Sequence, residues 1–343
     1  MIFFLESLSM KKYIIFHLIL LTFFSSALAI DDNYLSFKIT PRFELANGII
    51  NEYVYDENCL NDDNKLSQLD WDLRAIPVLG INADFNLLRY LYIGFEASMG
   101  VPIRSGNMQD YDWLNSVKGD GNYPEWIYDD PRQLTNYSKH NNFLEKYITF
   151  SARLGANIFL PAEIKLIPIL SYHYEFISFS GKDGYSLYKW NNWQQEPFSG
   201  KVISYKQELN SMLLGFAFEV SKFYHIYFYS DFFISPKMTF INCMDYHHRP
   251  RRFAPYGVAF WDNISNVFQL QTNIVTQYKF NKHHFAGINA YLQYIPVSKG
   301  DTRTKSLTAE AIPAKGAWSA PYIGSGGTSR LIWSIGLNYS FSL

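Results

Sequence analysis

Long stretches of this chain alternate, residue by residue, between apolar side chains and polar or small ones. Between Tyr147 and Ile158, every second position from Ile148 onward is apolar, and the stretches 266–280 and 331–343 repeat the pattern. A period of two residues over such a length indicates β-strand rather than helix. These stretches also exceed the usual strand of about five or six residues. A soluble β-sandwich alternates as well, so the alternation predicts strands without deciding their architecture.

The lengths of the links between the predicted strands favour one architecture. Short links are expected near 85–88, 160–163, 221–222 and 281–282. Long polar links fall between them, at roughly 49–65, 105–141, 182–201, 242–263 and 299–328. Tight turns that alternate with long loops are typical of an outer-membrane barrel, with the turns in the periplasm and the loops outside. We therefore predict an all-β, transmembrane, antiparallel up-and-down barrel of ten strands, with both termini in the periplasm.

Prolines and aromatic residues add detail to this barrel. Pro168 and Pro236 fall inside predicted strands, where a proline cannot donate to the hydrogen-bond ladder, so we expect local irregularities at both. Tyr and Trp residues cluster near the predicted strand ends, as in the aromatic girdles of such barrels. No linker or internal repeat divides the chain, so we expect one continuous sheet.

The composition excludes other classes of protein. The 343 residues include 30 Lys and Arg against 31 Asp and Glu, so the chain lacks the positive charge of a nucleic-acid-binding protein. Aromatic residues make up 18% of the chain, as large a share as the charged residues, which is too apolar a balance for a disordered chain. Two cysteines, Cys59 and Cys243, are too few for a cysteine-rich metal site or a disulfide framework.

The N-terminal residues have the pattern of a secretory signal peptide. Two lysines follow Met10, the run 13–24 is apolar apart from one histidine and one threonine, and an Ala-x-Ala cleavage pattern occupies 27–29. We predict a signal peptide over 1–29, with translation starting at Met10, and a barrel domain over 30–343. A transmembrane anchor fits less well because the apolar run is too short to span a bilayer as a helix.

Two pairs of residues have the spacing of a hydrolytic site. Asp110 and Asp112 lie at i and i+2, so both carboxylates point the same way on an extended backbone. Asp245 and His247 have the same spacing, and an acid beside an imidazole fixes its tautomer and strengthens it as a base. Both pairs fall in predicted extracellular loops or at the strand ends beside them. A cleft between them would have the groups needed to hydrolyse an amide.

Other interpretations of these residues stay open at this point. Two aspartates in a polar loop are usually solvated or bind calcium, and an acid two residues from a histidine is a weak signal. Cys243 lies near His247, so a thiol protease is conceivable. An exported lone thiol is more simply an inert residue or a disulfide partner for Cys59.

Several stretches together resemble the omptin family of outer-membrane aspartate/histidine endoproteases. They span nearly the whole predicted mature chain in the family's order, and the block Gly-Asn-Met-x-Asp-x-Asp-Trp is the most specific. The matching stretches are Glu52-Tyr53-Val54-Tyr55, Lys65-Leu66-Ser67-Gln68-Leu69-Asp70-Trp71, Ser105-Gly106-Asn107-Met108-Gln109-Asp110-Tyr111-Asp112-Trp113, Ile203-Ser204-Tyr205-Lys206-Gln207, Asp245-Tyr246-His247 and Lys299-Gly300-Asp301-Thr302.

The resemblance implies a ten-stranded barrel and a mechanism. Asp110 and Asp112 match the family's aspartate pair, and Asp245 and His247 match its Asp–His dyad. A water held between the two pairs would lose its proton to His247 and attack the scissile carbonyl. The resemblance implies no covalent intermediate, no metal and no cofactor.

The resemblance also implies where the substrate binds and how its recognition departs from the family's. The family's preference for cleaving beside basic residues is attributed to two carboxylates in the pocket for the residue before the cut. Glu52 matches one of them, and Met108 and Ile203 match apolar walls of that pocket. The second acid falls at Cys243, so we expect a relaxed preference for basic residues.

A second departure concerns lipid. The family binds lipid A on the outer wall around Tyr172, but here the next two outward positions are Tyr174 and Phe176, and Glu208 replaces a basic residue. Dependence on lipopolysaccharide is therefore doubtful.

The expected function is that of an endopeptidase in the bacterial outer membrane, with the site facing the exterior. Its expected partners are peptide or protein substrates outside the cell and outer-membrane lipid, with no nucleic acid. The alternative is a catalytically silent barrel that acts as an adhesin or binds host proteins through its loops. A diffusion pore is a weaker reading, because side chains such as Arg153, Gln269 and Gln271 would fill so narrow a lumen.

Overall fold

The computed structural model describes residues 35–56, 65–114, 133–223, 225–249 and 254–343. Within these ranges, no helix is both long and apolar enough to cross a membrane. The predicted signal peptide over 1–29 and Cys59 lie outside the described residues.

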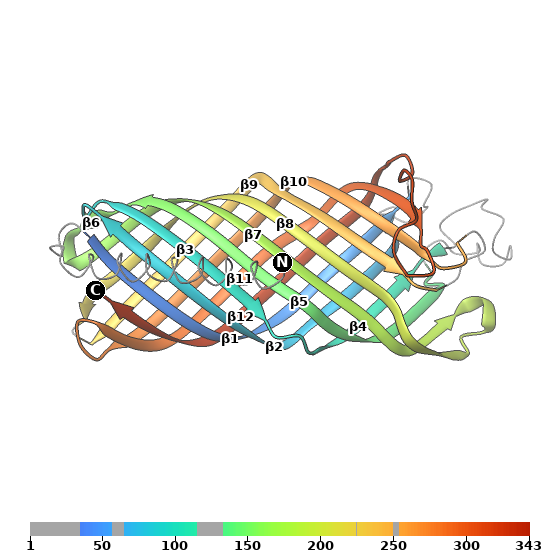
Figure 1. Ribbon diagram of the computed structural model, residues 1–343, viewed down its shortest axis with the longest axis horizontal. Helices are drawn as coiled ribbons and strands as arrows, with labels where there is room; N and C mark the ends of the chain where they lie inside the picture. Colours follow the sequence, from blue (N-terminus) through green and yellow to red (C-terminus); the bar gives the residue numbers. More distant parts are fainter. Residues whose placement is uncertain (1–34, 57–64, 115–132, 224, 250–253) are drawn as a thin grey trace, which may run out of the picture.

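In this part of the chain, twelve β-strand segments form one antiparallel sheet rolled into a barrel (Figure 1). The segments are β1 Leu35–Tyr55, β2 Lys65–Leu87, β3 Leu91–Gly100, β4 Arg104–Asp112, β5 Asn136–Ala156, β6 Ile158–Leu160, β7 Ile164–Tyr188, β8 Gln195–Phe223, β9 Ile226–His247, β10 Val258–Lys279, β11 His284–Ser306 and β12 Tyr322–Ser342. Short 3-10 turns occupy Pro161–Glu163 and Lys189–Asn191.

The twelve segments correspond to ten barrel strands. β3 and β4 lie end to end, because each of them pairs with both β2 and β5. β6 is a short continuation beyond β5 that pairs with β7. β1 pairs with β12, so the ring closes and has no free edge strand. The predicted ten-stranded antiparallel barrel is confirmed.

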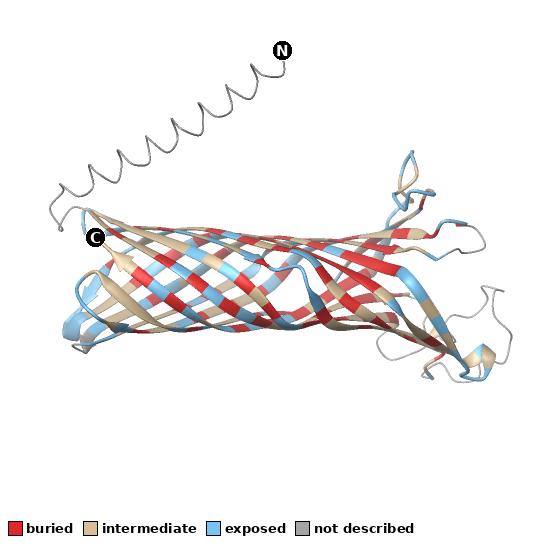
Figure 2. Cartoon of the chain, turned by 60° about the horizontal axis from the view of Figure 1, so that its bottom comes forward, coloured by how far each residue is buried: buried red, intermediate tan, exposed pale blue. Residues whose placement is uncertain are grey.

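The outer wall carries a band of exposed apolar side chains. Buried and exposed residues alternate along the strands, as the predicted period of two requires (Figure 2). On each barrel strand the band includes an exposed apolar residue, and these residues are Leu45, Leu79, Phe95, Phe150, Leu170, Phe216, Phe232, Ile274, Ile288 and Ile335. Towards the loops, the band ends near Phe240 on β9 and Leu331 on β12. A continuous apolar outer surface of this kind is the surface that faces lipid.

The strands extend further beyond this band than the alternation predicts. The predicted long links overlap strand ends, and the observed links are shorter, at 56–64, 113–135, 189–194, 248–257 and 307–321. The first turn was expected near 85–88 and lies at 88–90 instead. Outside the membrane, the outer face of a strand meets water, so apolar residues no longer have to alternate and the sequence signal for strand is lost.

The two prolines differ in their effect on the sheet. At Pro236 the register between β9 and β10 shifts, so the predicted irregularity is confirmed there. At Pro168 the ladder with β8 is regular, and the irregularity lies on the other side of β7. On its other side, pairing of β7 with β5 ends at Ile169 and pairing with β6 begins at Leu166. Pro168 therefore lies in a gap where no amide donor is needed.

Depth in the membrane should decide the effect of a charge on the outer wall. We expect Ile335→Arg to destabilise the barrel by about 2–4 kcal/mol, because Ile335 lies in the middle of the apolar band and is 57% exposed there. The same change at Ile323, beyond the band on the same strand, should cost about 0–1 kcal/mol. Urea unfolding in lipid vesicles measures both. Equal losses would show that the band does not face lipid.

Charged side chains fill the lumen inside this band. Glu96 accepts hydrogen bonds from Arg42 and Arg153, each at 2.6 Å. Arg153 also lies 3.5 Å from Asp231 on β9. The predicted lumen residues Gln269 and Gln271 are buried as well. Side chains that contact one another across the lumen narrow it, which argues against a diffusion pore.

A second network crosses the lumen nearer the loops. The buried guanidinium of Arg330 on β12 donates to Glu175 on β7 at 2.5 Å, to Gln207 on β8 at 2.9 Å and to Gln293 on β11. Because β12 and β7 are half a ring apart, the contact between Arg330 and Glu175 spans the barrel. These bonds tie opposite walls together.

An aromatic stack lies on the loop side of this network. Trp71 on β2 stacks on Phe179 of β7 at 5.7 Å and on Tyr205 of β8 at 5.4 Å between ring centroids. All three side chains are fully buried in one apolar cluster. Since β2 is three or four barrel strands away from β7 and β8, the stack crosses the lumen and forms a floor beneath its outer end.

Candidate active site

Asp245 and His247 lie together at the loop end of β9. His247 Nε2 is 2.5 Å from Asp245 Oδ2. Asp245 is buried, whereas part of the imidazole of His247 is exposed. The edge of the ring packs against Phe260 on β10, with 5.4 Å between ring centroids. The pair belongs to a regular strand and not to a loop, because residues 245 and 247 pair with β8 and β10.

Asp110 and Asp112 lie at the loop end of β4, also on a strand. Asp110 Oδ1 accepts a hydrogen bond from Ser67 of β2 at 3.4 Å, and Asp112 Oδ2 accepts one from Asn136 of β5 at 3.3 Å. Both aspartates are partly exposed. The two carboxylates are thus held from both neighbouring strands and remain accessible to water.

The two pairs face each other across the outer end of the lumen. Around the ring, β4 and β9 are separated by β5, β7 and β8 on one side and by five strands on the other. Two residues lie close enough to both sides for charges on each side to affect their pKa. The pKa of Glu52 on β1 responds to the charges of Asp245 and Asp110. The pKa of Tyr188 on β7 responds to those of Asp110 and Arg249. The structure therefore places all four residues that the sequence singles out at the outer end of the lumen, with Asp245 and His247 in contact.

The four predicted pocket residues lie at the same end of the barrel. Met108, Ile203 and Cys243 are fully buried and belong to the apolar cluster that contains the aromatic floor. Glu52 is 2% exposed, and its Oε2 has no hydrogen-bond partner. It lies three residues beyond Ile49, the register partner of Leu331, and hence outside the apolar band. Burial, followed by the charges of Asp245, Asp262 and Asp110, raises the pKa of Glu52 well above its ordinary value.

Cys243 is a buried free thiol. Its Sγ accepts hydrogen bonds from the Tyr205 hydroxyl at 3.1 Å and from the Gln207 amide at 3.5 Å. The residue lies beyond Phe240, outside the apolar band, and burial raises the pKa of its thiol far above the ordinary value. A nucleophilic cysteine needs a thiolate, so this environment argues against a thiol protease.

Asp262 on β10 joins this group of acids, and the sequence analysis missed it. It pairs in register with Cys243, is 3% exposed, and accepts a hydrogen bond from Thr302 of β11 at 2.7 Å. Burial is the main cause that raises its pKa to about 7, and the charge of Asp245 adds to the effect. No short motif contains Asp262; only Thr302, its hydrogen-bond donor, falls in a stretch that resembles the omptin family.

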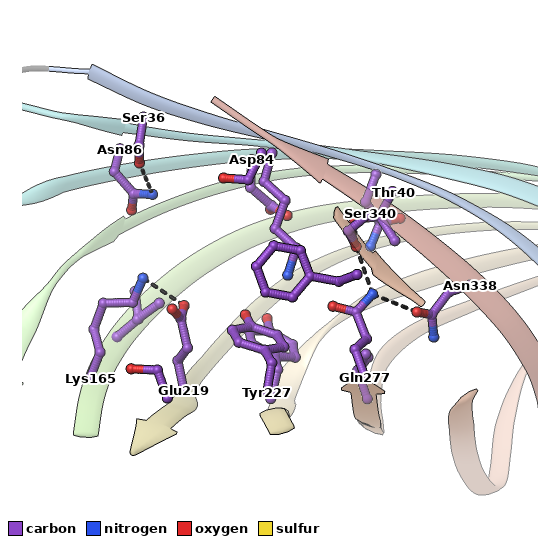
Figure 3. A pocket seen from close by; sticks show the side chains of 18 of the residues that line it. Ser36, Thr40, Asp84, Asn86, Lys165, Glu219, Tyr227, Gln277, Asn338 and Ser340 are labelled. Carbon is purple, nitrogen blue, oxygen red and sulfur yellow. Dashed lines mark hydrogen bonds and ion pairs between the residues drawn. The ribbon is translucent and has the colours of Figure 1, made fainter. Parts of the chain in front are cut away.

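A cavity in the described lumen lies away from these residues. It has a volume of about 290 Å³ and lies at the turn end, among Lys38, Asp84, Tyr227 and Gln277 (Figure 3). An ion pair between Lys165 and Glu219 at 2.6 Å borders it. None of the candidate residues lines this cavity. Among the described residues, no group of three or more His, Cys, Asp or Glu side chains is arranged to hold a metal ion.

Comparisons with known proteins agree with this geometry. The model of the omptin family matches residues 37–341. The chain is 27% identical over 108 residues to the plasminogen activator of Yersinia pestis, an alignment that spans only 32% of that protein and 32% of this chain. The fold is similar to the crystal structure of the outer membrane protease OmpT from Escherichia coli, with a TM-score of 0.76, 16% identity, and coverage of 90% of this chain and 97% of that one. Because the family model covers nearly the whole described barrel, this chain belongs to the omptin family, and its barrel is one of the bacterial outer membrane.

Proposed function

We propose that this protein is an endopeptidase that hydrolyses peptide bonds at the extracellular face of the outer membrane. The observation that carries the proposal is the 2.5 Å contact between Asp245 and His247, which faces Asp110 and Asp112 across the barrel mouth. The names of the two similar proteins, a plasminogen activator and an outer membrane protease, agree with it.

His247 acts as the general base in this mechanism. Its Nε2 lies against the Asp245 carboxylate, so the neutral ring keeps a proton on Nε2, and Nδ1 is the nitrogen that accepts the proton of the water. A water between the two pairs gives its proton to the ring as its oxygen attacks the scissile carbonyl. The buried carboxylate of Asp245 stabilises the imidazolium that forms, which then returns the proton to the departing amine.

Asp110 and Asp112 position that water from the other wall. Two carboxylates that point the same way disfavour each other's ionisation, so the pair shares a proton readily. The ionised oxygen accepts a hydrogen bond from the attacking water, and the protonated one donates to the oxyanion of the tetrahedral intermediate. Neither step forms a covalent bond to the protein.

Glu52 supports cleavage beside a cationic residue. Its carboxylate is buried next to apolar walls formed by Met108 and Ile203. A cationic substrate side chain that binds there is shielded from water and donates a charge-assisted hydrogen bond to the carboxylate. With Cys243 neutral, one carboxylate alone gives a weaker basic preference than two would. Outer-membrane lipid surrounds the barrel. Lipopolysaccharide dependence stays doubtful, because the exposed Tyr172 donates its hydroxyl to Asn210, the next two outward residues are Tyr174 and Phe176, and an acid, Glu208, follows Gln207 on β8.

A refolded barrel offered a quenched fluorescent peptide library should cleave it, and sequencing the products should show which bonds are cut. Retention of host proteins by the barrel without any cleavage would contradict the proposal and favour the adhesin.

The thiol of Cys243 should be dispensable for the chemical step. We expect Cys243→Ser to keep kcat within about threefold, because the buried sulfur only accepts hydrogen bonds from Tyr205 and Gln207 and an alcohol can do the same. Cleavage of a neutral peptide by the refolded variant measures this. Loss of activity by orders of magnitude, with folding intact, would restore the thiol-protease reading.

A further inference from the structure

Glu52 and Asp262 are buried acids without a cation. Among the described residues, neither forms an ion pair, while Asp245 has His247 as its partner. Glu52 interacts electrostatically with Asp262, so the two carboxylates belong to one local field. Two buried acids that lack a positive neighbour are unfavourable when ionised, and a cation that enters from outside removes that penalty.

The unsatisfied oxygen of Glu52 is a separate sign of a ligand. Glu52 is 2% exposed. Burial raises its pKa and the nearby indole of Trp71 opposes that rise, yet Oε2 makes no hydrogen bond of ordinary geometry. A buried carboxylate oxygen without a donor costs free energy in the unliganded protein. A donor from the substrate would satisfy it.

The backbone makes room for Asp262 to reach towards the strand of Glu52. Thr302 on the neighbouring β11 holds the carboxylate by its 2.7 Å hydrogen bond. One strand further, a Cβ at Gly326 of β12 would lie 2.7 Å from Asp262 Cγ, so the space that the carboxylate occupies exists only because residue 326 is glycine. Gly326 is the register partner of Val54, two residues from Glu52. The side chain thus extends across β11 to β12, which is the neighbour of β1.

We infer that Asp262 is a specificity-determining residue, which together with Glu52 forms a two-carboxylate pocket for a cationic substrate side chain. Asp262 is the register partner of Cys243. The family's second pocket acid falls at Cys243 on β9, and here Asp262 on the neighbouring strand β10 supplies a carboxylate in its place. The inference rests on the proposed peptidase function. It replaces the weaker basic preference expected from Glu52 alone by a preference as strong as two carboxylates give. Arg is the better ligand, because a planar guanidinium offers donors to two carboxylates at once.

The test compares peptides with Arg or with citrulline before the cut, since citrulline has nearly the same shape without the charge. We expect Asp262→Asn to lower the Arg-over-citrulline ratio of kcat/KM by about tenfold to a hundredfold, the loss of one charge-assisted hydrogen bond. Cleavage of the citrulline peptide measures any general loss of activity in the variant, and the ratio removes that loss from the comparison. An unchanged ratio would overturn the inference. If the unmodified protein cleaves neither peptide, the proposed function fails instead.

Asp301→Asn is the matched control. Asp301 precedes Thr302, pairs with Asn263, and accepts a backbone hydrogen bond from Gly324 at 3.1 Å, so its side chain lies on the other face of the sheet from Asp262. This variant should keep the ratio. A ratio that falls equally in both variants would mean that general surface charge governs recognition, and would overturn the inference.

An exchange of the two paired positions tests the inference when Asp262→Asn does not refold. In Cys243→Asp/Asp262→Cys the carboxylate moves to the adjacent strand and the number of acids is unchanged. We expect the Arg-over-citrulline ratio to stay within about threefold of the unmodified protein. A rise of about tenfold or more would show that the pocket previously lacked its second acid, and that Asp262 lies outside it.

The pH dependence of the ratio gives an independent readout. The groups that face Asp262 are Asp245 and the thiol of Cys243 on β9, Glu52 on β1 and the Thr302 hydroxyl on β11. Because the pKa of Asp262 is about 7, the ratio should fall as the pH falls through that value and the carboxylate gains a proton, and this part of the fall should be absent from Asp262→Asn, which keeps Glu52. An Arg-over-citrulline ratio that stays constant across the pH range around 7 would contradict binding of the substrate cation by the Asp262 carboxylate.

Discussion

Replacing His247 by alanine should lower kcat/KM for peptide cleavage by about 100- to 10,000-fold, the range that a positioned general base contributes. Asp245→Asn should have an effect of similar size. An amide next to Nε2 no longer favours a proton on that nitrogen, so the neutral ring carries its proton on Nδ1 and cannot accept one from the water there. Neither change should affect folding, since His247 is partly exposed and the amide of Asn fills the space of the acid. Steady-state kinetics on refolded barrels, together with heat-modifiable migration on gels, measures both quantities.

The neighbouring histidine supplies the control for this prediction. His248 is half-buried, shares a hydrogen bond of 2.9 Å with Ser204 and stacks on Tyr246, but it contacts no carboxylate. His248→Ala should therefore keep most of the activity. If His247→Ala remains nearly fully active, or if both histidines matter equally, the assignment of the base is wrong.

Removing Glu175 should cause the largest loss of stability. Glu175→Leu leaves the buried guanidinium of Arg330 without its carboxylate, and an uncompensated buried charge costs about 3–5 kcal/mol. The double variant Glu175→Leu/Arg330→Met should recover most of this loss, because it removes the charge together with its partner. Guanidinium unfolding of the barrel in vesicles measures both variants. Equal losses in the single and double variants would show that the pair is not coupled.

The membrane-spanning part of the fold could be predicted because lipid imposes a strict rule on it. Each outward residue must be apolar and each inward residue faces a packed lumen, so Ile335 and its neighbours on β12 follow a period of two. Beyond the lipid no such rule holds, and the ends of β7, β8 and β11 were assigned to loops. The proline in β7 predicts an irregularity at Pro168, but the form of that irregularity, a break between β5 and β6, depends on the neighbouring strand and not on the sequence around the proline.

The candidate site divides along a similar line. Asp110, Asp112, Asp245 and His247 form short motifs, so their side chains are neighbours whatever the sheet register. Asp262 is far from any of them in sequence, and only the pairing of β9 with β10 brings it beside Cys243. A sequence without register information offers no reason to choose this aspartate over the other aspartates of the chain.

The aromatic floor formed by Trp71, Phe179 and Tyr205 crosses the lumen beneath its outer end and separates that end from the rest of the barrel. If the proposed peptidase function holds, a polypeptide that enters the outer end of the lumen meets these rings and goes no deeper, so both fragments leave on the side from which the substrate came. The same rings would separate periplasmic proteins from Asp245 and His247. Proteolysis outside the cell would then leave the permeability barrier of the outer membrane intact.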